Sequence, residues 1–265
     1  MAATTTPVRP HEGRLAGRAF AYWMANYRRV WRGTIISGFL GPLFFLVAMG
    51  FGLGALVDDG GLGGTGYVEF IAPGLLAAQA MQTAVGESTF PVMGALKWHR
   101  QYHAMLATPL GIADLVLGHV AFVTMRVAIT SVAFAVVAVA LGAIASWWVL
   151  AAVFAAVLTG LAFTTPVFAF AARQDNDSGF NVLFRFIVMP MFLFSGTFFP
   201  VSQLPALLEA IARVTPLWHG VELCRGLVLE TATVAGSLGH AGYLLLWAAG
   251  GLWLAFASFR KRLVT

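Results

Sequence analysis

The chain has 265 residues, of which 59% are hydrophobic and 10% are charged, and its mean hydropathy is +0.82. A soluble domain carries about 25% charged residues, so this composition excludes a soluble globular protein and indicates one that crosses a membrane several times. The net charge of +5 does not indicate nucleic-acid binding, because the basic residues stand beside hydrophobic segments, where they set membrane orientation. The single cysteine, Cys224, excludes an intramolecular disulfide and a cysteine-based metal site.

The N-terminal region combines a polar tail with an amphipathic helix. Residues 1–13 are small, polar and proline-containing, and they predict a cytoplasmic tail. Over residues 14–32, at about 100° per residue, arginines and aromatic residues fall on opposite sides of a helix. The two sets include Arg14, Arg18, Arg28 and Arg29 on one side and Phe20, Trp23 and Tyr27 on the other. This pattern predicts a helix at the membrane interface, with its aromatic residues in the acyl boundary. The alternative is a juxtamembrane segment whose arginines only set orientation.

Six apolar segments follow. The predicted spans cover residues 34–57, 68–94, 115–143, 148–172, 182–199 and 238–259. Basic residues lie in the N-terminal region, in the connector 95–114, in the loop 173–181 and at the C-terminal end, whereas the loops 58–67 and 144–147 hold none. By the positive-inside rule, both termini lie in the cytoplasm. We therefore predict one all-α domain over residues 1–265, with six transmembrane helices in the cytoplasmic membrane.

The fifth predicted span leads into an interrupted stretch. The chain breaks at Ser195-Gly196 and at Pro200, and residues 200–230 are half-polar. Irregular backbone at membrane depth is tolerated only where protein or a water-filled cavity satisfies its polar groups. The stretch therefore predicts a re-entrant extracellular helical hairpin between spans five and six. The alternative is two short amphipathic helices on the outer surface.

Aromatic and charged residues within these segments suggest functional positions. Phe194, Phe198 and Phe199 stand near the predicted break, where they form either a hydrophobic gate or ordinary packing. Glu87 and Arg126 lie inside spans, where ionisable residues are costly and need partners. At 1.5 Å rise per residue their side chains reach similar depths, which predicts an ion pair that either braces two helices or couples transport to an ion.

Two stretches of this C-terminal half resemble a known family. SGTFFPVSQLP and TPLWHGVELCRGL are similar to the C-terminal signature of ABC-2 type permeases, the membrane subunits of one class of ATP-binding-cassette exporters. The branch that transports nodulation factors (lipo-oligosaccharides) or confers daunorubicin resistance is the most similar, and the order of segments agrees over nearly the whole chain. The family also begins with a helix like that predicted for residues 14–32.

The resemblance implies that the connector 95–114 docks an ATPase. Its Leu-Ala-Thr-Pro-Leu at residues 106–110 is similar to the end of the family's coupling helix, although Trp98-His99-Arg100 replaces the usual Glu-Arg-rich stretch. Tryptophan and arginine are favoured anchors of interfaces. The candidate coupling residues are Lys97, Trp98, His99, Arg100, Tyr102, His103, Leu106, Ala107, Thr108 and Pro109. The alternative is an ordinary basic loop with one helical turn.

The chain contains no site for ATP itself. Its two lysines, Lys97 and Lys261, follow Leu96 and Arg260, whereas a P-loop needs Gly-Lys-[Ser/Thr]. We therefore expect no cofactor on this chain, and place ATP and Mg on a separate ATPase subunit. His219 and Glu222 are three residues apart without a further ligand nearby, so we expect no metal site.

The leading prediction is a permease subunit of an ABC exporter for an amphipathic cargo, namely a lipid-linked glycan, a glycolipid or a hydrophobic drug. Its partners would be an ABC ATPase, a second copy or paralogue, and membrane lipids. The first alternative is an ion-coupled secondary transporter using Glu87 and Arg126, although no inverted repeat is visible. The second is a membrane-embedded enzyme, which would need acids, bases or metal ligands that converge at one depth.

Overall fold

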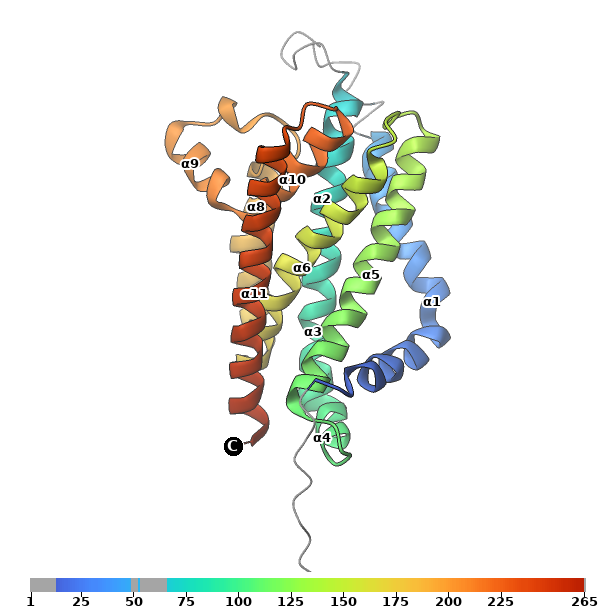
Figure 1. The fold of residues 1–265 in the computed structure, drawn as a ribbon, viewed down its shortest axis with the longest axis vertical. Coiled ribbons are helices and arrows are strands. Elements are labelled where there is room, and N and C mark those ends of the chain that lie inside the picture. Colours follow the sequence, from blue (N-terminus) through green and yellow to red (C-terminus); the bar gives the residue numbers. More distant parts are fainter. Residues whose placement is uncertain (1–12, 49–51, 53–65, 265) are drawn as a thin grey trace, which may run out of the picture.

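The computed structural model describes residues 13–48, 52 and 66–264, and every regular element in this part of the chain is helical (Figure 1). The predicted all-α fold is therefore confirmed for the described residues. The long helices are α1 (Ala16–Val47), α2 (Tyr67–Ser88), α5 (Ile112–Ala140), α6 (Val149–Arg173) and α11 (Val234–Val264). The short helices are α3 (Phe90–Met93), η3 (Gly94–Trp98), α4 (Gln101–Leu106), α7 (Ser178–Leu183), η4 (Phe184–Val188), α8 (Met189–Phe194), η5 (Val201–Gln203), α9 (Ala206–Val214) and α10 (Pro216–Val228).

Three of these helices, α5, α6 and α11, are long and apolar enough to cross a membrane. The protein is thus a membrane protein. The predicted span 182–199 is helical only as far as Phe194 and consists of three short pieces, α7, η4 and α8. The predicted span 34–57 and the loop 58–67 lie partly outside the described residues, so the count of six spans stays a prediction.

Helix α6 occupies the centre of the bundle and contacts α2, α5, α10 and α11. Its buried Ala152, Ala156 and Gly160 recur every four residues, a spacing that lets neighbouring helices approach closely in membranes. The approach of α11 is equally close at Gly251. A Cβ atom there would lie 2.6 Å from the Cδ atom of Pro166, so a larger residue would push α11 away from α6.

Helix α1 is continuous from Ala16 to Val47, whereas a boundary between residues 32 and 34 was predicted. Its N-terminal part crosses the lower end of the bundle before the helix turns upward (Figure 1). The prediction that Trp23 and Tyr27 lie in the acyl boundary is wrong. Both are buried, with 7% and 8% of their surface exposed, because α1 packs against α5. The four predicted arginines are exposed, Arg14 just before the helix and the other three within it, and Phe20 is half-buried.

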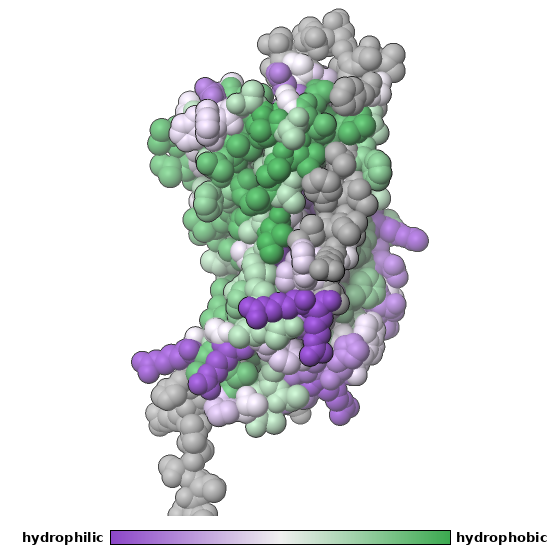
Figure 2. All heavy atoms as spheres, turned by 90° about the vertical axis from the view of Figure 1, so that its right-hand side faces the viewer, coloured by the Kyte–Doolittle hydropathy of each residue, from purple (hydrophilic) through white to green (hydrophobic). Residues whose placement is uncertain are grey.

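The two ends of the bundle differ in composition. One end carries α4, the start of α1 and the last turn of α11, and we call it the connector end; the opposite end carries α9 and α10, and we call it the far end (Figure 1). Hydrophilic side chains gather toward the connector end, whereas the surface nearer the far end is largely hydrophobic (Figure 2). An apolar belt beside a polar end is the surface expected of a protein that sits in a bilayer.

Candidate functional site

The connector presents a continuous exposed surface at one end of the bundle. Arg100 adopts a left-handed backbone conformation with φ of 49°, and this turn redirects the chain from η3 into α4. Trp98 is 61% exposed. The other exposed candidates are His99, Arg100, His103, Ala107, Thr108 and Pro109, and Lys97 and Leu106 are half-buried. Nine of the ten predicted coupling residues thus have surface that a partner can reach.

Tyr102 is the exception, because its side chain is fully buried. Its hydroxyl group lies 2.6 Å from Nδ1 of His119 in α5. Tyr102 and Met105 face the bundle from the same side of α4, whereas His103 and Ala104 face outward. Tyr102 therefore cannot contact an ATPase directly, and instead attaches the connector to the transmembrane bundle.

A buried aromatic group surrounds this hydrogen bond. The ring of Trp23 stacks on His119 at a centroid distance of 3.8 Å, and Phe168 meets His119 edge-on at 5.0 Å. Phe259 packs edge-on against Tyr102 at 5.5 Å. We call these five residues the His119 cluster. Its members come from α1, α4, α5, α6 and α11, so the connector packs against four long helices at this cluster. No local sequence pattern relates its members, because they come from five different helices.

The two ionisable residues predicted to pair do lie together. Nη2 of Arg126 donates a hydrogen bond of 2.8 Å to Oε1 of Glu87, and their side chains are 9% and 25% exposed. The guanidinium of Arg126 also stands over the ring of Tyr27, 4.8 Å from its centroid. The pair thus connects α2 to α5, and Tyr27 adds α1 to the same contact.

A cavity of about 360 Å³ lies between α1, α2, α5 and α8. Its walls are formed by Gly41, Phe45, Leu75, Gln79, Gln82, Phe134 and Phe192. The rings of Phe45 and Phe192 both contact Phe198, at 5.5 Å and 5.1 Å. Of the three predicted gate residues, Phe198 thus belongs to this aromatic group. Phe194 is 42% exposed and Phe199 is half-buried.

Two features of this cavity escaped the sequence analysis. Phe45 and Phe192 are 147 positions apart, and no local pattern relates them. Gln79 and Gln82 were visible as polar residues within an apolar segment, and their spacing of three places them on one helical face. That spacing was the available signal for the polar wall of this cavity.

Arg225 organises the far end. Its guanidinium donates to the carbonyl oxygens of Gly196 (2.6 Å) and Phe70 (3.3 Å) and to Oε1 of Glu222 (3.0 Å), and it lies 3.9 Å from the Phe70 ring centroid. Gly196 itself has φ of 82°, a conformation that favours glycine. The break after α8 is therefore held by a buried arginine that also contacts α2. Within the described residues no group of three or more His, Cys, Asp or Glu side chains converges, and we assign no metal centre.

Comparison with known proteins identifies the class of this helical membrane protein. The ABC-2 type transporter family matches residues 18–229, and the chain belongs to that family. It is therefore a membrane permease subunit of a transporter. Nodulation protein J of Rhizobium leguminosarum bv. trifolii is 33% identical over 249 residues, which cover 91% of this chain and 94% of the relative.

Two further relatives extend the comparison. Nodulation protein J of Bradyrhizobium diazoefficiens is 32% identical, over 92% of this chain and 93% of the relative. Inner membrane transport permease YadH of Escherichia coli is 21% identical, over 74% of this chain and 79% of its own length. No solved structure matches.

Proposed function

We propose that the chain is the membrane subunit of an ATP-driven exporter that moves an amphipathic cargo, such as a lipid-linked glycan, a glycolipid or a hydrophobic drug, across the cytoplasmic membrane. Family membership and the relatives named Nodulation protein J and Inner membrane transport permease YadH support this proposal. Two copies, or one copy and a paralogue, form the pathway, and separate ATPase subunits drive it. The connector end and both termini face the cytoplasm, as the distribution of basic residues predicts.

The observation that carries the proposal is the two-sided connector. Trp98 and His103 face outward, where an ATPase would bind, whereas the hydroxyl of Tyr102 on the same connector is hydrogen-bonded to His119. Closure of the ATPases would push the connector, and the His119 cluster would pass this displacement to α1, α5, α6 and α11. A surface loop with no such inward attachment would not transmit force to the bundle.

The cavity between α1, α2, α5 and α8 supports the choice of cargo. It combines the aromatic rings of Phe45 and Phe192 with the amides of Gln79 and Gln82. Ligand sites are mostly apolar with a few placed polar groups, so a cargo with both a hydrophobic and a polar part fits these walls. Phe198, which contacts both rings, would then gate the cavity.

A pull-down with an ATPase assay tests the proposal. The tagged protein is purified in mild detergent from cells that express its whole operon, and the recovered ATPase activity is measured. We expect an ATPase to co-purify, and Trp98→Ala to weaken its recovery about tenfold, the loss typical of an interface anchor. Trp147→Ala is the matched control, because Trp147 is 90% exposed and lies in the turn between α5 and α6, away from the connector.

An ion-coupled transporter predicts the opposite outcome. In that case no ATPase co-purifies with the wild-type protein, and transport stops when the proton gradient is dissipated. Recovery of an ATPase whose binding is indifferent to Trp98→Ala would retain the ABC permease but remove the connector as its docking surface.

A further inference from the structure

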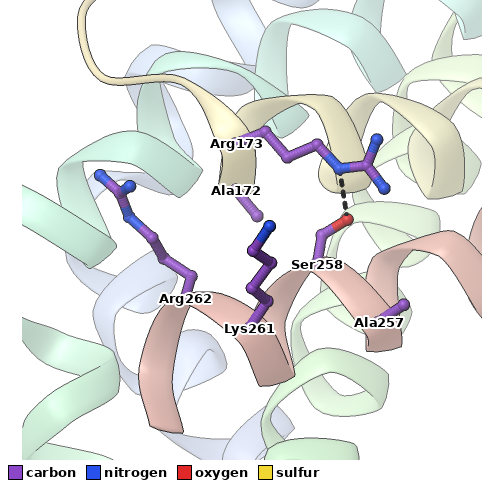
Figure 3. Close-up of a pocket in the computed structure, with 6 residues that line it drawn as sticks. All are labelled: Ala172, Arg173, Ala257, Ser258, Lys261 and Arg262. Carbon is purple, nitrogen blue, oxygen red and sulfur yellow. Dashed lines mark hydrogen bonds between the residues drawn. The ribbon is translucent and has the colours of Figure 1, made fainter. Parts of the chain in front are cut away.

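A second cavity, of about 920 Å³, opens at the connector end between the last turns of α6 and α11. It is lined by Ala172, Arg173, Ala257, Ser258, Lys261 and Arg262 (Figure 3). Arg173 crosses above the cavity from α6, and the ammonium of Lys261 points from α11 toward α6 (Figure 3). Three of the six lining residues are cationic, and none is acidic.

Neighbouring side chains orient two of the three cationic groups. Nε of Arg173 donates to Oγ of Ser258 at 2.9 Å, and Nη2 of Arg262 donates to Oδ1 of Asp175 at 2.7 Å. Asp175, whose side chain is 79% exposed, stands outside the lining. Three cationic side chains thus line the cavity, with no acidic side chain among the lining residues. Like charges repel at short range, so an anion between them would stabilise this end of the bundle.

The depth and the walls of the cavity indicate the kind of anion. Both α6 and α11 are apolar enough to span the membrane, and the basic residues occupy their last turns, the level of lipid phosphates. Ala172 and Ala257 supply an apolar wall. Trp253, 70% exposed, lies one turn before Ala257 on the same face of α11 and offers an apolar surface to an acyl chain. A soluble anion has no acyl chain and would gain nothing by contacting that apolar surface.

We propose that this cavity binds the phosphate headgroup of an anionic phospholipid, with an acyl chain along α11. Basic pockets between transmembrane helices at the cytoplasmic side are suited to such headgroups. Assignment of the lipid to the inner leaflet rests on the orientation given under the proposed function, whereas binding itself does not. Asp175 links the site to the connector, because it accepts a hydrogen bond from Arg262 and also forms an ion pair with Lys97 at 3.6 Å.

Native mass spectrometry of the full chain in detergent tests the site. Phosphatidylglycerol and phosphatidylcholine with identical acyl chains are added in competition, and the bound ratio is measured. We expect a clear preference for phosphatidylglycerol. Each cation near a headgroup contributes about fivefold to binding, so Lys261→Gln should lower the preference about fivefold, and the triple variant Arg173→Gln, Lys261→Gln, Arg262→Gln should abolish it.

The control removes the same charge elsewhere. Arg18→Gln, Arg28→Gln, Arg29→Gln neutralises three exposed arginines of α1 and should change the preference less than twofold. Equal losses of preference in both triple variants would show a non-specific charge effect and overturn the site. An unchanged preference in the variant Arg173→Gln, Lys261→Gln, Arg262→Gln would overturn it too. Lys261→Gln keeps the Arg173 and Arg262 hydrogen bonds, so this single variant tests the site if the triple variant does not fold.

Competition with inorganic phosphate tests the assignment to a lipid. Displacement of the lipid by millimolar inorganic phosphate would overturn that assignment, because it would identify a soluble-anion site. None of these outcomes depends on an ATPase.

Discussion

At the scale of single residues, the Glu87–Arg126 contact poses the sharpest question, because an ion pair within the membrane either braces helices or takes part in transport. Removing one partner leaves the other charge poorly compensated, at a cost of about 3 kcal/mol for a largely buried pair. We therefore expect Arg126→Met to lower the unfolding temperature in detergent by several degrees. The loss should be larger than for Arg213→Met, since Arg213 pairs with Glu209 on an exposed surface.

The double variant Glu87→Gln, Arg126→Met separates the two roles. It removes both charges together, so a pair that only braces α2 and α5 should regain most of the lost stability and of the transport rate. Recovery of the unfolding temperature without recovery of transport would instead indicate a coupling role and favour the ion-coupled alternative.

Tyr102 supplies the second prediction at this scale. Tyr102→Phe keeps the ring but removes the hydroxyl that contacts Nδ1 of His119, so a buried polar atom loses its partner. Such a loss costs about 1–3 kcal/mol. We expect a lower unfolding temperature and a lower transport rate, with ATPase binding unchanged, measured by thermal unfolding and by pull-down. Trp98→Ala should show the reverse pattern, with stability kept and ATPase binding lost. Equal effects of the two variants on ATPase binding would contradict the two-sided connector.

At the scale of helices, the crossing of α1 over α5 depends on Gly118. A Cβ atom at this position would lie 2.5 Å from Cβ of Ala19 and 2.7 Å from the carbonyl oxygen of Ala16. Gly118→Ala should therefore push α1 away from α5 and destabilise the protein by about 1–3 kcal/mol, as overpacking does. Gly17→Ala, in α1 on the other side of the crossing, is the control, since nothing lies within 4 Å of its Cβ position; it should be neutral or slightly stabilising. Thermal unfolding of both variants in one detergent checks the difference, and equal stability would refute the close crossing.

Helix α1 shows what hydrophobic periodicity can and cannot predict. The 100° pattern correctly separated the arginines from Trp23 and Tyr27, because helix geometry alone determines which residues share a face. It did not reveal what the aromatic face contacts, since lipid and protein both favour apolar side chains. In the structure the aromatic face of α1 packs against α5, where the missing side chain of Gly118 allows the close approach. A glycine in an apolar span was the available signal.

At the scale of the whole molecule, composition, apolar segments and charge were sufficient to predict a helical membrane protein, whereas the family followed only from the resemblance of SGTFFPVSQLP and TPLWHGVELCRGL to its C-terminal signature. The candidate site was predictable only in part. The pairing of Glu87 with Arg126 followed from the cost of charge in a membrane, whereas the inward side of the connector did not, because Tyr102 meets His119 only once α4 and α5 are packed. The same holds for Phe45 and Phe192, whose contact depends on how distant helices assemble.

One exposed carboxylate connects three distant parts of the molecule. Asp175, in the loop after α6, accepts a hydrogen bond from Arg262 at the end of α11 and pairs with Lys97 of the connector. The hydrogen bond from Arg262, together with the charges of Arg262 and Lys97, lowers the pKa of Asp175 below its usual value of 3.8. A lowered pKa in the folded state means that the contact stabilises the protein above pH 3.8 and is lost as the pH falls through the lower, folded-state value.

Asp175→Asn should therefore loosen the connector from the C-terminal end at pH 7, and acid should loosen it in the wild type only at a pH below 3.8. Spin labels at His99→Cys and Val264→Cys, two exposed positions, report this as a broader distance distribution. The distribution of the Asp175→Asn protein should already be broad at pH 7 and should change little between pH 5 and pH 3. Salt near 1 M should broaden the wild-type distribution as well, because exposed ion pairs are screened. Asp177→Asn, two residues further along the same exposed loop, is the control and should behave as the wild type does. A narrow distribution in Asp175→Asn at pH 7 would mean that packing of the His119 cluster alone positions the connector.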